Sequence, residues 1–160
     1  MSTILLVDDE QDTLDLFAEV LEQMNHRALE AHDGDEALSI ARSVHPDLVV
    51  TDWMMPRMDG LELCHRLHED AHLQDIPIIL HSSSGDPHAP GTQFVPKNYP
   101  LADFENLVSR VLASSHAQRS AASSDREGSR APPPEAVRTS YPSHPTRRSG
   151  LGEHACSTAH

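Results

Sequence analysis

Over the first 112 residues, two patterns of apolar and polar positions alternate along the chain. Short, wholly apolar runs such as Ile4–Val7 and Leu48–Val50 are bounded by acidic or turn-forming residues, which is typical of strands buried on both faces. Between these runs, apolar residues recur every three or four positions, as in amphipathic helices. The pattern predicts strands over 3–7, 27–31, 48–50, 76–80 and 92–95. It predicts helices over 12–24, from a cap at Asp35 through Ala41, over 60–67 and over 101–112.

The alternation of strands and helices predicts an α/β fold. Its sheet should be parallel, with right-handed crossovers and helices on both faces. Asp8 and Asp9 directly follow the first predicted strand, and Asp52 follows the third. The carboxyl ends of parallel strands meet at one edge of a sheet, where open α/β sheets build their sites. We therefore expect these three carboxylates at the same edge of the sheet.

Charge is unevenly distributed along the chain. Residues 1–113 contain 21 Asp and Glu but only 6 Lys and Arg, which argues against binding nucleic acid through a basic surface. Two cysteines, Cys64 and Cys156, are too few for a disulfide framework. The apolar run at the N-terminus is too short for a signal peptide, and no run is long enough to span a membrane. The expected location is the cytoplasm.

The last 47 residues have a different composition from the rest. They contain ten Ser, five Pro and six Arg, and their large apolar residues are Val137, Tyr141 and Leu151. Such a segment buries too little surface to offset the loss of chain entropy on folding. We therefore predict a folded domain over 1–113 and a disordered tail over 114–160.

The stretch Asp52-Trp53-Met54-Met55-Pro56-Arg57-Met58-Asp59-Gly60 contains the pattern Asp-x-x-Met-Pro-x-Met-Asp-Gly. This pattern resembles the phospho-acceptor segment of bacterial response-regulator receiver domains. The resemblance covers residues 2–113 and implies a flavodoxin-like sheet with strand order 2-1-3-4-5. It also implies that Asp52 is the phospho-acceptor.

The resemblance also assigns a cation site. Three carboxylates at one sheet edge are costly unless their charge is compensated, and a hard divalent cation such as Mg²⁺ suits oxygen ligands. By resemblance, Asp9 would bind Mg²⁺ directly, Asp8 mainly through water, and Asp52 through one oxygen. Met54 would contribute its backbone carbonyl.

Three further residues match family positions around the phosphoryl group. Ser82, with Ser83 and Ser84 beside it, lies five residues after Pro77, where receiver domains place a Ser or Thr. Lys97 is the only lysine in the sequence and resembles the lysine of the family's Lys-Pro-Phe/Tyr segment. Phe94 lies where the family has an aromatic residue that changes rotamer on activation. The resemblance gives all three a role in phosphate binding or switching.

The sequence departs from the family pattern in two places. Asn98 follows Lys97 where the family has a proline. Only 14 residues separate Ser82 from Lys97, and this interval contains Pro87, Pro90 and two glycines. Because these residues oppose a helix, we predict that the usual fourth helix is reduced or absent.

The resulting prediction is a stand-alone phosphorelay domain. A histidine kinase or phosphotransfer protein would donate the phosphoryl group to Asp52, and phosphorylation would change affinity for an unknown downstream protein. The chain would not be an enzyme beyond its own phosphoryl transfer and dephosphorylation. One alternative is a binding module that does not switch by phosphorylation. Another is an Asp-nucleophile phosphatase of the haloacid-dehalogenase type, but Met54 occupies the position of its second Asp.

Overall fold

The computed structural model describes residues 1–126, and side chains up to residue 122. The strands are β1 (Thr3–Val7), β2 (Arg27–Ala31), β3 (Leu48–Asp52), β4 (Ile78–Ser82) and β5 (Thr92–Pro96). The helices are α1 (Gln11–Gln23), α2 (Gly34–Val44), α3 (Gly60–Glu69) and α4 (Leu101–Arg126). All strand pairs in this described part are parallel, and the order is β2-β1-β3-β4-β5. The predicted flavodoxin-like fold is confirmed.

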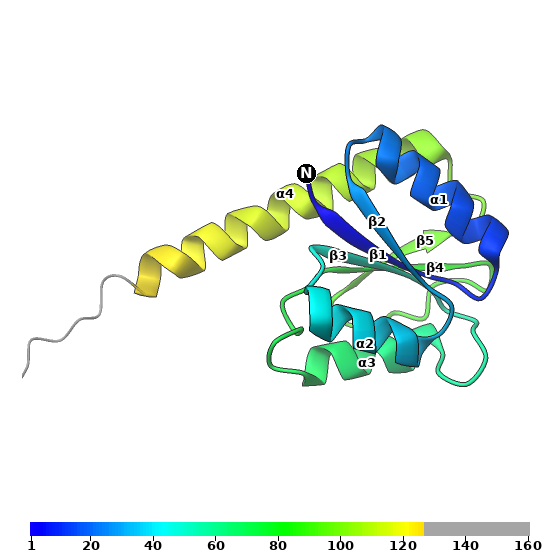
Figure 1. Ribbon diagram of the computed structural model, residues 1–160, viewed down its shortest axis with the longest axis horizontal. Coiled ribbons are helices and arrows are strands. Elements are labelled where there is room, and N and C mark those ends of the chain that lie inside the picture. The colour runs from blue at the N-terminus through cyan, green and yellow to red at the C-terminus, as the bar shows by residue number, and fades with distance from the viewer. Residues whose placement is uncertain (127–160) are drawn as a thin grey trace, which may run out of the picture. The chain divides into compact units, whose positions relative to one another are not determined.

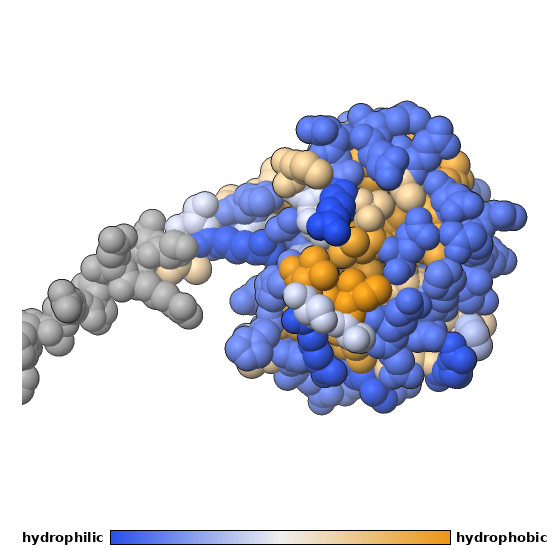
Figure 2. All heavy atoms as spheres, in the orientation of Figure 1, coloured by the Kyte–Doolittle hydropathy of each residue, from blue (hydrophilic) through white to orange (hydrophobic). Residues whose placement is uncertain are grey.

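Helices cover both faces of the sheet. Helices α1 and α4 lie on one face, and α2 and α3 lie on the other (Figure 1). Each layer encloses its own apolar core, one around Phe17 and Phe104 and the other around Leu38 and Leu63. The face drawn in Figure 2 is hydrophilic over the helices and apolar in its middle, where the sheet lies between the layers. Each helix therefore turns its apolar side toward the sheet, as its amphipathic pattern predicts.

The connection between β4 and β5 contains no helix. The described residues 83–91 form a bend, irregular backbone and a turn. Gly85 and Gly91 have φ of 91° and 75°, a region that costs glycine little. The predicted loss of the fourth helix is therefore confirmed.

Two predicted boundaries were wrong for local reasons. Asp33, not Asp35, caps α2, because its Oδ1 accepts a hydrogen bond from the Glu36 N–H at 2.9 Å. The fourth strand begins at Ile78, two residues later than predicted. The Pro77 carbonyl accepts from the Val49 N–H at 3.0 Å, but proline has no N–H with which to continue the ladder.

Helix α4 extends past the predicted domain boundary at residue 113. It continues to Arg126, and residues 113–126 contain neither glycine nor proline. Ser115 is buried, and Arg119 Nη1 donates to Asp47 Oδ1 at 2.9 Å. Tertiary contacts thus hold a segment whose composition alone predicts disorder. The remainder of the predicted tail, residues 127–160, lies outside the described residues. Among the residues described, no helix is both long and apolar enough to cross a membrane.

Candidate functional site

Asp8 and Asp52 meet at the carboxyl edge of the sheet. Asp52 is the last residue of β3, and Asp8 follows β1, which pairs with β3 through Val7 and Thr51. Each aspartate is only 3% exposed. Asp9, next along the chain, is exposed, but its charge raises the pKa of both Asp8 and Asp52 after the larger effect of burial. Asp8 and Asp52 are therefore close neighbours, and Asp9 acts on both through its charge.

The two buried carboxylates are incompletely compensated. Asp8 Oδ1 accepts from the Glu10 N–H at 2.9 Å, whereas Asp8 Oδ2 and Asp52 Oδ1 have no hydrogen-bond partner within the described part of the chain. Burial raises the pKa of Asp8 to about 6 and also raises the pKa of Asp52. Buried, unpaired carboxylate oxygens fit a divalent cation, which supplies the missing charge and accepts oxygen ligands.

Lys97 faces these carboxylates from the loop after β5. Its Nζ lies 3.6 Å from Asp52 Oδ2, 3.9 Å from Asp8 Oδ2 and 3.7 Å from Glu10 Oε2. Burial by itself lowers the pKa of Lys97, but the three carboxylates outweigh it and the pKa is raised. The Lys97 N–H donates to the Ser82 carbonyl at 3.0 Å. The peptide bond to Asn98 is trans, since none of the described peptide bonds is cis.

The remaining predicted site residues lie around this centre. Ser82 ends β4, is 1% exposed, and accepts a hydrogen bond on its Oγ from the Ser84 N–H at 3.1 Å. Met54 lies two residues after Asp52, and its side chain is exposed. Phe94 is half-buried on β5, opposite Leu80 of β4. It belongs to neither apolar core of the described residues.

Gly60, the last residue of the motif, allows the chain to return against Asp52. A Cβ at this position would lie 2.2 Å from the Asp52 carbonyl oxygen. The Gly60 N–H donates to the Trp53 carbonyl at 2.8 Å, and Asp59 caps α3 by accepting from the Glu62 N–H at 2.8 Å. The motif therefore has a packing role. It closes the loop of residues 53–59 back onto the end of β3.

The structure adds two site residues that the sequence analysis did not identify. Glu10 supplies the third carboxylate near Lys97. His81 lies opposite Asp52 in the β3–β4 register and is 5% exposed. One ligand atom each from Asp8, Asp52 and His81 lies within 4.8 Å of the other two. A polar residue ending the apolar run Ile78–Leu80, immediately before Ser82, was the signal that could have identified His81.

Burial also controls the ionisation of His81. It lowers the pKa of the imidazole to about 4, with a further contribution from the positive charge of Lys97. The imidazole is therefore neutral at physiological pH. Its ring meets the ring of Phe17 edge-on, with centroids 4.9 Å apart and an interplanar angle of 89°. Phe17 thus holds the ring on the α1 side of the sheet.

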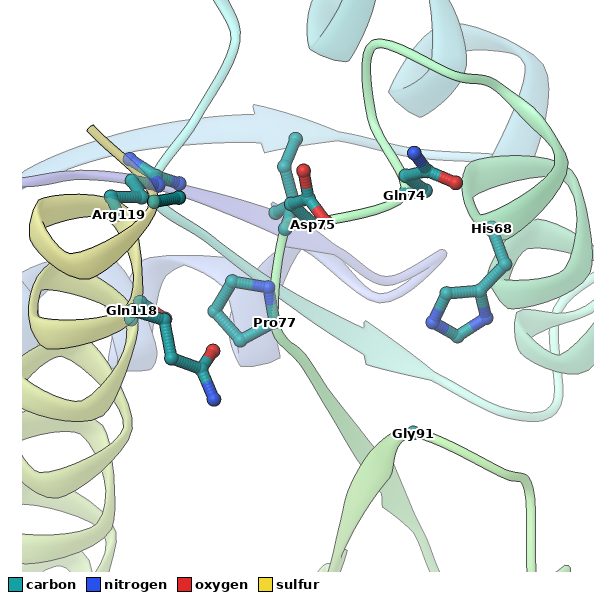
Figure 3. A pocket seen from close by; sticks show the side chains of 10 residues that line it. His68, Gln74, Asp75, Pro77, Gly91, Gln118 and Arg119 are labelled. Atoms are coloured by element: carbon teal, nitrogen blue, oxygen red, sulfur yellow. The ribbon is translucent and has the colours of Figure 1, made fainter. Parts of the chain in front are cut away.

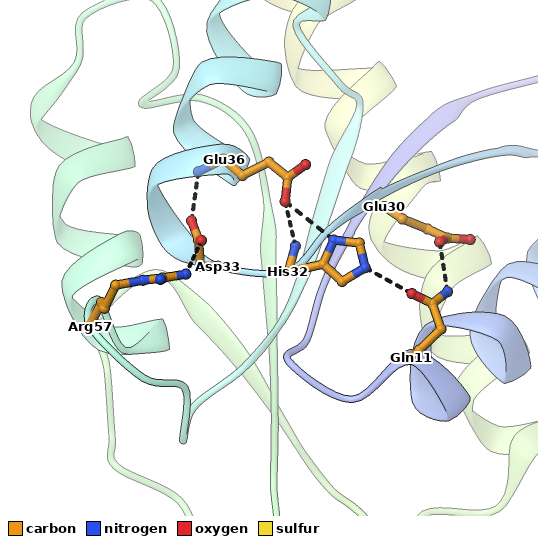
Figure 4. A network of polar contacts seen from close by, with 6 residues as sticks. All are labelled: Gln11, Glu30, His32, Asp33, Glu36 and Arg57. Carbon is orange, nitrogen blue, oxygen red and sulfur yellow. Dashed lines mark hydrogen bonds and ion pairs between the residues drawn. The ribbon is translucent and has the colours of Figure 1, made fainter.

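A polar network surrounds the site on the α1–β2–α2 side (Figure 4). Gln11 at the start of α1 donates to Glu30 at 3.1 Å and pairs with His32 at 2.8 Å. Glu36 accepts from the His32 N–H at 2.8 Å, and Arg57 of the motif loop pairs with Asp33. The network connects the loops after β2 and β3 to the beginning of α1. These are exposed pairs, so each contributes little stability.

A hollow of about 520 Å³ lies between the segment before β4 and helix α4, away from the Asp8 and Asp52 carboxylates. Figure 3 shows Gln74, Asp75 and Pro77 before β4 facing Gln118 and Arg119 of α4. None of the residues expected to accept phosphate or bind a cation lines it. The carboxylate centre at the other end of β4 therefore remains the candidate site.

Comparison with known proteins gives the family context. A family profile described as the response regulator receiver domain matches residues 4–94. The chain is 39% identical over 84 residues to the phosphate regulon transcriptional regulatory protein PhoB of Pseudomonas aeruginosa, covering 52% of this chain and 37% of that protein. It is 34% identical over 77 residues to the polar-differentiation response regulator DivK of Brucella ovis, covering 48% and 63%. The match thus spans about a third of the length of PhoB.

Solved structures agree with this comparison. The signal receiver domain of a signal transduction histidine kinase from Syntrophus aciditrophicus aligns with a TM-score of 0.67 at 27% identity, covering 71% of this chain and 92% of that one. The receiver domain of the hybrid histidine kinase CckA aligns with a TM-score of 0.61 at 30% identity, covering 69% and 98%. The similarity therefore extends over almost the whole of each neighbouring domain.

Proposed function

Since the chain belongs to the response regulator receiver domain family, we propose that it accepts a phosphoryl group on Asp52. The donor is a histidine kinase or phosphotransfer protein, and the reaction requires Mg²⁺. The observation that carries this proposal is the arrangement of Asp52, Asp8 and Lys97. Two buried carboxylates, each with one oxygen that has no hydrogen-bond partner among the described residues, lie 3.6–3.9 Å from an ammonium group.

The chemistry follows from the nucleophile and its surroundings. A carboxylate oxygen of Asp52 attacks the phosphorus of the phosphohistidine. The O–P bond forms as the N–P bond breaks, and the bonding electrons remain on the donor imidazole. Lys97 balances charge on the phosphoryl oxygens, and a bound Mg²⁺ supplies further positive charge there. The Asp8, Asp9 and Asp52 carboxylates and the Met54 carbonyl would hold that ion.

The same arrangement supports a switch. Lys97 now interacts with three carboxylates. A phosphoryl group on Asp52 brings new anionic oxygens toward its ammonium, so these interactions must be redistributed. Ser82 offers a hydroxyl at the adjacent end of β4. Redistribution at the β4 and β5 ends can change the affinity of the surface for a downstream protein.

One observation supports a second candidate function. Receiver domains normally place a helix between β4 and β5, whereas residues 83–91 here are not helical. A surface that lacks this element could bind a partner without responding to phosphorylation. The second candidate is therefore a receiver-like binding module with a constant affinity for its partner.

Phosphorylation by acetyl phosphate tests the proposal. With Mg²⁺, the wild-type protein should gain one phosphoryl group by intact-mass analysis, and Asp52→Asn should gain none, because the amide lacks the anionic nucleophile. The matched control is Asp75→Asn, an exposed aspartate before β4, which should be phosphorylated like wild type. A wild-type protein that stays unmodified with both acetyl phosphate and a phosphohistidine donor would leave only the binding module.

A further inference from the structure

His81 gives the cation site a nitrogen donor. One of its ring nitrogens and single oxygens from Asp8 and Asp52 all lie within 4.8 Å of one another. His81 lies on β4, Asp8 directly follows β1, and Asp52 ends β3. All three are at least 95% buried, with exposures of 5%, 3% and 3%. Two of the carboxylate oxygens, one on each aspartate, have no hydrogen-bond partner in the described chain. The cluster is thus a set of buried donors whose positive charge comes from Lys97, at 3.6 Å from Asp52 and 3.9 Å from Asp8, and two of its oxygens still accept no hydrogen bond from the described residues.

The spacing of these donors suits a single ion. Ligand atoms held at about 2.0–2.2 Å from one ion lie at most about 4.4 Å apart. The three atoms lie within 4.8 Å of one another, so movements of at most about 0.8 Å in each side chain would bring them to bonding distance from one ion. The strands need not move, because His81 and Asp52 are already opposite one another in register.

The donor chemistry indicates which ions benefit. Mg²⁺ prefers oxygen ligands and binds an imidazole nitrogen only weakly. First-row transition ions such as Mn²⁺ and Co²⁺ accept both carboxylate oxygen and imidazole nitrogen. We propose that His81 is a ligand at this centre, so that the site binds such transition ions more tightly than its carboxylates alone would. This inference rests on the proposed cation site, but not on phosphoryl transfer.

Packing alone does not require a histidine here. His81 lies on the same sheet face as Ile79, where Phe17 of α1 and Phe104 of α4 pack. An apolar residue would fill this space without a desolvation cost. The ring contact with Phe17 fixes its position, but an aliphatic side chain could pack there as well. The polar nitrogens are what distinguish His81 from such a residue.

Metal titration of the full-length chain can test this role. Trp53 is the only tryptophan and directly follows Asp52, so its fluorescence reports on ions at the site. Without any phosphodonor, Co²⁺ and Mg²⁺ are titrated into wild type, His81→Val and His81→Asn. Loss of His81 should raise the Kd for Co²⁺ by about tenfold or more, and leave the Kd for Mg²⁺ unchanged. His65→Val, at an exposed histidine of α3, should alter neither Kd.

A measurement on wild type makes the result independent of whether the variants fold. With one equivalent of Mn²⁺ bound, electron spin echo spectroscopy should show coupling to an imidazole nitrogen, and Asp52→Asn should abolish that signal. Absence of nitrogen coupling in wild type, or equal losses of Co²⁺ and Mg²⁺ affinity in both His81 variants, would overturn the inference. If acetyl phosphate still modifies Asp52 in that case, the proposed function stands without it. If wild type neither binds a cation nor accepts phosphate, both fail.

Discussion

Asp8→Asn should stabilise the cation-free protein at neutral pH. Asp8 is buried beside Asp52, and burial raises its pKa from an ordinary value of 3.8 to about 6. Folding therefore opposes ionisation of this group, and above pH 6 the native state carries the cost of a buried charge. The difference between the two values corresponds to about 3 kcal/mol. The amide retains an oxygen that can accept from the Glu10 N–H, but it carries no charge.

The sign of the pH dependence follows from linkage. A carboxyl group whose pKa is higher in the folded state holds its proton more tightly there, so wild type is relatively most stable below pH 3.8. Wild type loses this contribution to its folding stability as the pH rises to about 6. The advantage of Asp8→Asn should therefore be absent near pH 4, grow up to pH 6, and level off near about 3 kcal/mol above it.

Urea unfolding in EDTA at pH values from 4 to 8 measures this difference. Asp75→Asn, at an exposed aspartate, is the control and should follow wild type across the range. Adding Mg²⁺ should reduce the advantage of Asp8→Asn, because an ion that binds the native state stabilises wild type more. An Asp8→Asn variant that is equally or less stable at pH 7.5 in EDTA would refute the argument from burial.

Three other predictions follow from the site and its surroundings. Lys97→Met should still accept a phosphoryl group, but its tryptophan fluorescence and its hydrogen-exchange pattern should not change on phosphorylation. A change as large as that of wild type would count against Lys97 as the switch. Hydrogen exchange should be fast over 83–91 and slow over 78–82, and a protected 83–91 segment would contradict the loop assignment. Gly60→Ala should lower the free energy of unfolding in urea by about 1–3 kcal/mol, because the added methyl group would clash with the Asp52 carbonyl oxygen. An unchanged unfolding midpoint would refute that clash.

The position of the site was largely determined by the sequence. Buried strands are short apolar runs, and parallel strands end at the same edge, so the pattern places Asp8, Asp9 and Asp52 at one edge of the sheet. The strand order that the family resemblance implies then makes the first and third strands neighbours. Lys97 was identifiable as the chain's only lysine after an apolar run. The missing helix between β4 and β5 was also predictable, because prolines and glycines act locally on the backbone.

Tertiary structure alone decided the properties that depend on neighbours distant in sequence. Composition could not show that α4 extends to Arg126, because Ser115 and Arg119 are held by residues far along the chain. Nor could the sequence show that His81 faces Asp8 and Asp52, since strand register determines which residue on β4 stands opposite Asp52. Local patterns specify elements and their ends, whereas burial, charge compensation and ligand geometry arise only when separate strands are paired.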